Sequence, residues 1–128
     1  MNRISSKFLS LKNVEGFINA LSYENKKLDG ILLLTSFGIV FGKFYEVKEL
    51  SDSNSISDIL MNSQNETFNT LKSEGFEIFG DGSTIILKDA YVKYSYGIVL
   101  NMDEVIIFCD QIIGFYPVDL DKFSSFHK

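Results

Sequence analysis

The sequence predicts a mainly β protein with helices, of the α+β class, built on a small and strongly bent five-stranded barrel. Residues 31–47 contain two hydrophobic runs joined by a short turn at Ser36-Phe37-Gly38, a pattern typical of a β-hairpin. Segments 84–96 and 104–116 are rich in β-branched and aromatic residues, which favour strands. Between and before these segments the apolar residues recur at helical spacing.

The composition indicates one globular domain over residues 1–128. A chain of 128 residues can bury about two-thirds of its unfolded surface, which is enough for a stable core. The hydrophobic fraction of 45 % argues against disorder. A single cysteine, Cys109, rules out an internal disulfide, and no Cys/His cluster suggests a metal site. We therefore expect no cofactor and no metal.

Charge and hydropathy limit the partners. No apolar run approaches the roughly 20 residues that span a bilayer, and the N-terminal region lacks the features of a signal peptide. We therefore expect a cytoplasmic protein with no membrane partner. The net charge of −5, with Arg3 as the one arginine, argues against a general phosphate-binding surface. Double-stranded DNA is thus disfavoured as a partner.

An N-terminal helical segment is expected over residues 1–27. Its apolar residues follow the period of an amphipathic helix, with a break expected near Asn13 or Gly16. The first strand is then expected from Leu28 or Ile31 to Ser36, and the second from Ile39 to about Val47. Gly42 lies inside the second strand, where a glycine marks a bend or the close approach of another backbone. Phe44 and Val47 are expected to continue inward through this bend.

The segment 49–82 is expected to be an insertion that contains a second helix. Ser53 or Ser55 can cap this helix, which is expected over about 55–73 and ends at Gly75. Its apolar face must be covered, either by the barrel itself or by a partner chain. Residues 76–79 are a candidate for a short strand.

The rest of the chain reads as three strands. One begins at Thr84, and two more at 104–108 and 111–116 flank a tight corner at Cys109-Asp110. A polar break is expected at 101–103. Pro117 is expected to end the last strand and to leave 118–128 as a polar tail.

Three stretches in this order resemble motifs of the Sm-like family, the ring-forming RNA-binding proteins that include the bacterial RNA chaperones. Residues 42–47 (GKFYEV) resemble the bent second strand of the family, and 84–90 (TIILKDA) resemble its third. Residues 105–113 (VIIFCDQII) resemble its second motif. The resemblance implies a five-stranded bent barrel and assembly of the chain with itself, in a ring.

The positions that contact RNA in the family differ here. Lys48 stands where the family has a base-contacting Asp, and Thr84 stands where it has an Asn. The Arg-Gly pair of the second motif corresponds to Phe108-Cys109, so that only Asp110 remains in register. The resemblance thus implies the scaffold without the family's usual RNA pocket.

Two sets of candidate site residues follow. For single-stranded RNA they are Thr84 and Asp110, with Tyr94, Tyr96 and Lys93 as a surface that could stack bases and meet phosphates. Packing between strands or an oligomer interface explains the same tyrosines. For the oligomer interface the candidates are Val105, Ile107, Ile112 and Phe115, on the last two strands. Cys109 is expected to be a buried packing residue rather than a reactive thiol.

The main functional hypothesis is a non-enzymatic Sm-like module that self-assembles and serves as a binding or interaction scaffold. Its partners would be copies of itself, single-stranded RNA or another protein. One alternative is a single-stranded RNA-binding protein with a divergent pocket. Another is a small-molecule-binding or regulatory domain with the inserted helix as a lid.

Overall fold

The computed structural model describes residues 6–22, 28–77 and 82–123. It is an α+β structure with a five-stranded antiparallel open sheet and three helices. The chain divides into two compact units, here called the sheet unit (Met1–Tyr45 with Ser83–Lys128) and the helical unit (Glu46–Gly82). In sequence, the helical unit corresponds to the segment 49–82 that was expected to be an insertion.

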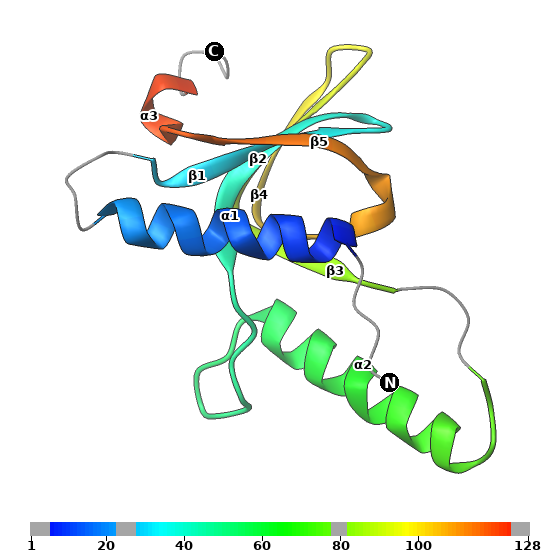
Figure 1. Cartoon of the computed structure of the whole chain (residues 1–128). Helices are drawn as coiled ribbons and strands as arrows, with labels where there is room; N and C mark the ends of the chain where they lie inside the picture. The colour runs from blue at the N-terminus through cyan, green and yellow to red at the C-terminus, as the bar shows by residue number, and fades with distance from the viewer. Residues whose placement is uncertain (1–5, 23–27, 78–81, 124–128) are drawn as a thin grey trace. The chain divides into compact units, whose positions relative to one another are not determined.

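The sheet unit contains all five strands (Figure 1). Its elements in chain order are α1 (Ser6–Ser22), β1 (Gly30–Thr35), β2 (Gly38–Tyr45), β3 (Thr84–Tyr94), β4 (Val99–Phe108), the 3-10 turn η1 (Cys109–Gln111), β5 (Ile112–Val118) and α3 (Leu120–Phe123). The strand order is β4-β3-β2-β1-β5. Although β4 and β5 follow each other in the chain, they lie at opposite edges of the sheet.

The β1–β2 hairpin is closed by Thr35 and Gly38. The Thr35 hydroxyl donates to the Gly38 carbonyl at 2.7 Å and accepts from the Gly38 N–H at 3.1 Å. Gly38 has φ 151°, and a Cβ placed on it would lie 2.1 Å from the carbonyl oxygen of Lys93. Only glycine therefore fits where β2 meets the end of β3.

Gly42 lies opposite a β-bulge in β3. Phe41 pairs with Tyr91 and Lys43 with Lys88, so β3 has one residue more than β2 at this point. Such a bulge bends and twists the strands locally. A Cβ on Gly42 would lie 3.1 Å from the Lys88 carbonyl oxygen. The close approach of another backbone, predicted for this glycine, is confirmed.

The core lies between one face of the sheet and α1. Three residues of α1 at helical spacing, Leu11, Val14 and Ile18, belong to the same buried cluster as strand residues that include Ile31 and Leu33. Since side chains alternate along a strand, Leu34 points away from this cluster and is exposed. α1 is continuous from Ser6 to Ser22, so the predicted break near Asn13 or Gly16 is wrong.

Three other local predictions are also wrong. β4 runs through the expected polar break at 101–103 because Asn101 pairs with Tyr91 across the ladder to β3. β5 continues past Pro117, which pairs with Ile31; proline is tolerated there because β5 is an edge strand. Val47 is 39 % exposed and lies beyond the end of β2, although Phe44 does pack on the core.

The helical unit is organised by Asp58, which is 1 % exposed. Its carboxylate accepts hydrogen bonds from the N–H groups of Lys48 at 2.8 Å and Ser55 at 3.1 Å. Ser55 caps α2 (Ile56–Ser73), since its hydroxyl accepts from the Asp58 N–H, which completes a capping box. The helix ends next to Gly75, which has φ 91°. Phe76 and Glu77 form no strand, and residues 78 and 79 lie outside the described residues.

Candidate functional site

The residues predicted to bind RNA fall at two separate places on the sheet unit. Thr84 and Asp110 lie near each other, because Thr84 pairs with Phe108 and the Cys109 N–H donates to the Ser83 carbonyl at 2.8 Å. Lys93 is nine positions further along β3, or about 30 Å of extended strand. These residues therefore do not form one site within a single chain.

Tyr94 and Tyr96 form a short aromatic stack at the β3–β4 turn. Their ring centroids are 5.3 Å apart with an interplanar angle of 19°. Tyr94 also packs against Phe37, with ring centroids 6.0 Å apart, and is half-buried on the core. Tyr96 is 71 % exposed. Since Lys93 adjoins Tyr94 in β3, its side chain points to the opposite face of the sheet.

The η1 turn is attached to the β1–β2 hairpin. The Ser36 N–H donates to the Gln111 carbonyl at 3.0 Å, and the two side chains are also hydrogen-bonded. Asp110 is exposed and lies 3.3 Å from the Gln111 amide nitrogen. Ser36 and Gln111 were not predicted, because their pairing depends on the fold of segments far apart in the chain.

Two of the four predicted interface side chains belong to the protomer's own core. Ile107 and Ile112 are 4 % and 1 % exposed, so an edge contact would involve their backbone rather than their side chains. Val105 is half-buried on the core, and Phe115 is 38 % exposed. Of the predicted set, Phe115 presents the most side-chain surface.

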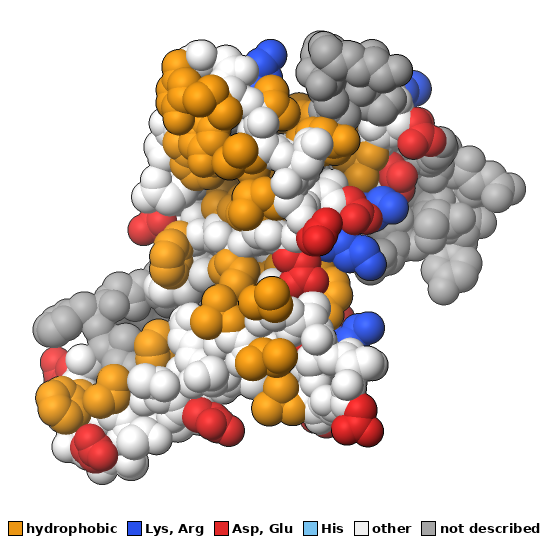
Figure 2. All heavy atoms as spheres, turned by 180° about the vertical axis from the view of Figure 1, so that it is seen from behind, with side chains coloured by type: hydrophobic (Ala, Val, Ile, Leu, Met, Phe, Trp, Pro, Cys, Tyr) orange, Lys and Arg blue, Asp and Glu red, His pale blue; other side chains and the backbone are white. Residues whose placement is uncertain are grey.

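The two edge strands expose other apolar side chains that were not predicted. On β4 these are Val99, Leu100, Met102 and Phe108, and on β5 they are Ile113 and Tyr116. Figure 2 shows hydrophobic side chains gathered over the β3–β4 hairpin, at the upper left. Successive side chains of a strand point to opposite faces of the sheet. A core position for Ile112 would therefore have predicted that its neighbour Ile113 is exposed.

The outer backbone edges of β4 and β5 have no strand partner among the described residues. A strand edge of this kind presents a row of N–H and C=O groups that another strand can pair with. β5 contains no charged residue, and β4 contains Asp103 and Glu104. Natural sheets often block such edges with charged side chains. The β5 edge lacks this protection and the β4 edge has it only at Asp103 and Glu104, so the two open edges form the candidate functional site.

The described part of the chain can be searched for metal-binding groups and for helices that could span a membrane. Within residues 6–22, 28–77 and 82–123, no group of three or more His, Cys, Asp or Glu side chains is placed to hold a metal ion. Every helix over the same residues is too short or too polar to cross a membrane.

No model of a known protein family matches the chain, and no curated protein matches its sequence significantly. The function is therefore inferred from the geometry of this chain alone.

Proposed function

We propose that the chain is an Sm-like module that assembles head to tail with copies of itself and serves as a binding or interaction scaffold. A bent antiparallel sheet of five strands preceded by a helix supports the Sm-like assignment. The observation that supports assembly is the pair of open edges, β4 and β5, at opposite ends of the sheet.

In the proposed contact, β4 of one copy pairs with β5 of the next. Backbone hydrogen bonds would then satisfy both open edges, and the exposed apolar residues beside them would become buried. Because the two surfaces are different, each copy keeps one edge free for a further copy. A head-to-tail contact of this kind closes into a ring when the rotation between copies allows it.

We also propose that the module is not an enzyme. The one thiol of the chain, at Cys109, is 1 % exposed within the core, which argues against thiol catalysis. A scaffold role needs no reactive group, since its affinity comes from buried area and backbone pairing.

Replacing Ile113 with lysine tests the assembly. Ile113 is 75 % exposed on β5, so the change leaves the protomer's core intact. At the interface, however, it buries a charge without a partner, and we expect association to weaken about 30-fold or more, equal to about 2 kcal/mol. Analytical ultracentrifugation of both proteins over a concentration series measures this change.

Leu60→Lys is the matched control, because Leu60 is 52 % exposed on α2, outside the edge strands. We expect it to sediment like the original protein. The proposal fails if the original protein is monomeric at the highest concentrations, or if Leu60→Lys dissociates the assembly as strongly as Ile113→Lys.

Single-stranded RNA binding is a second candidate function, supported by the stack of Tyr94 and Tyr96, in which Tyr96 is exposed. An unpaired base can extend such a stack, so Tyr96→Ala is expected to weaken binding of an oligouridine by about 1–3 kcal/mol. Fluorescence anisotropy at low salt measures the affinity, with Phe76→Ala as a control for loss of an exposed aromatic ring elsewhere. Absence of binding by the original protein to oligonucleotides of any sequence would exclude this function.

A further inference from the structure

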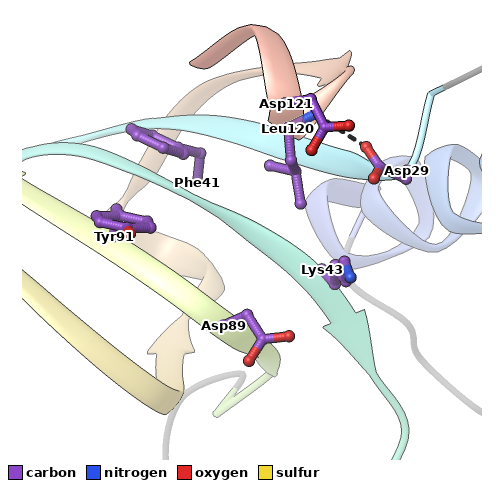
Figure 3. A pocket seen from close by; sticks show the side chains of 7 residues that line it. All are labelled: Asp29, Phe41, Lys43, Asp89, Tyr91, Leu120 and Asp121. Atoms are coloured by element: carbon purple, nitrogen blue, oxygen red, sulfur yellow. Dashed lines mark hydrogen bonds between the residues drawn. The ribbon is translucent and has the colours of Figure 1, made fainter. Parts of the chain in front are cut away.

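The sheet unit has a pocket that is independent of the proposed assembly. It measures about 200 Å³ and is formed by residues of β2 and β3 together with the segments that precede β1 and follow β5 (Figure 3). Phe41 adjoins the core residue Val40 in β2, so it points to the face of the sheet opposite α1. The pocket therefore opens on the face that α1 leaves uncovered.

Two aromatic rings form one side of the pocket. Phe41 and Tyr91 are paired across β2 and β3, with ring centroids 5.5 Å apart and an interplanar angle of 16°. Phe41 is 5 % exposed, so its position is fixed by packing. A stacked pair of this kind offers an aromatic surface at the pocket wall, which suits an apolar or cationic group.

The opposite side of the pocket is held by a hydrogen bond between distant segments. The Leu120 N–H, at the start of α3, donates to Oδ1 of Asp29 at 2.9 Å. The Leu120 side chain lies over Gly30, where a Cβ would be 2.5 Å from its Cγ. These contacts attach the end of β5 to the start of β1. The pocket is therefore largely formed before any ligand binds.

Carboxylates outnumber cations around the pocket. Among the described residues, Asp29, Asp89 and Asp121 line it with Lys43 as the one basic residue, and Figure 3 shows the carboxylates of Asp29 and Asp121 on one side and that of Asp89 on another. Neither Asp89 nor Lys43 makes a side-chain hydrogen bond or ion pair with any residue that the structure describes. The local charge therefore favours a cationic ligand.

We propose that this pocket binds a small organic cation, namely a guanidinium or alkylammonium group on a short chain. Tyr91, the more exposed ring of the pair, would contact the cation, and the carboxylates would accept its N–H groups. The same chemistry is offered by a free amine or guanidine and by the side chain of an arginine in a peptide.

The size of the pocket favours a small ligand. A volume of about 200 Å³ lies below the roughly 300 Å³ at which pockets for drug-sized ligands begin. It is therefore too small to enclose a whole nucleotide.

The test is a titration with butylguanidinium, followed by amide chemical shifts in NMR, with the uncharged butylurea as the matched probe. We expect butylguanidinium to shift the amides of Gly42 and Asp89, and butylurea to shift neither. Asp89→Asn is expected to weaken binding about twofold to fivefold. Asparagine is chosen because Asp89 has φ 52°, a conformation that asparagine tolerates better than other side chains.

Two further variants make the proposal falsifiable. Lys43→Gln removes a like charge, so butylguanidinium is expected to bind about twofold to fivefold more tightly. Glu66→Gln changes the net charge by the same amount as Asp89→Asn, but Glu66 lies on α2 and does not line the pocket. We therefore expect Glu66→Gln to leave the affinity for butylguanidinium unchanged. Weaker binding to Lys43→Gln, equal binding of butylurea, or an equal effect of Glu66→Gln and Asp89→Asn would overturn it.

A second arm of the titration distinguishes the two sources of the cation. The probe is an N-acetylated, C-amidated arginine, which presents the same guanidinium on a peptide backbone. If it binds more tightly than butylguanidinium, the occupant is assigned to a peptide side chain. If butylguanidinium binds more tightly, a free amine or guanidine is assigned. If neither binds, the proposal is wrong.

Discussion

Replacing Gly38 with alanine is expected to destabilise the sheet unit by about 3–5 kcal/mol, through backbone strain and overpacking together. The new Cβ would lie 2.1 Å from the Lys93 carbonyl oxygen, at a φ of 151°. This oxygen belongs to the backbone of β3, where Gly38 pairs with Tyr94, so it cannot move away without breaking the ladder. Urea unfolding followed by circular dichroism measures the change.

Alanine substitutions at two other glycines separate the backbone strain from the overpacking that Gly38→Ala introduces. Gly97 has φ 100° but nothing within 4 Å of the Cβ that an alanine would add, so Gly97→Ala is expected to cost only the backbone strain, about 1–2 kcal/mol. Gly16 also has open space and lies in α1, so Gly16→Ala is expected to stabilise the protein by about 1 kcal/mol. If Gly38→Ala and Gly97→Ala unfold at the same urea concentration, the close contact at Gly38 does not exist.

Leu11→Ala is expected to cost about 3–5 kcal/mol, because it removes a fully buried side chain and leaves a cavity. Leu11 is 0 % exposed in α1 and belongs to the same buried cluster as the strands. The loss should appear as a lower midpoint in urea with an unchanged m-value.

Leu9→Ala is the matched control on the same helix. Leu9 is 52 % exposed, so its replacement is expected to change stability by less than about 1 kcal/mol. Similar losses for Leu9→Ala and Leu11→Ala would contradict the packing of α1 on the sheet.

The fold class and most of the elements could be predicted because their signals are local. The two apolar runs around Phe37-Gly38 form the β1–β2 hairpin, and Ser55 and Gly75 bound the helix of the inserted segment. The failures at 101–103 and Pro117 share a cause. In both places backbone pairing with a neighbouring strand outweighed the preference of the side chains.

The candidate sites were less predictable, because they depend on strand register and on contacts between distant segments. Ile112 and Ile113 are identical in type, yet one is 1 % exposed and the other 75 %. The register of β5 on β1 decides which of them faces the core. In the pocket, Asp29 and Leu120 meet only because β1 and β5 are neighbours in the sheet. The positive φ of Asp89 was not predicted, because no turn motif marks this position within β3.

The short η1 connection between the two edge strands has a consequence for the proposed assembly. Three residues carry the chain from one open edge to the other, and the hydrogen bonds between Ser36 and Gln111 fix their orientation on the hairpin. If copies pair through β4 and β5, the direction in which each copy receives its neighbour is set by this turn. The geometry of η1 would then determine the number of subunits in the closed ring.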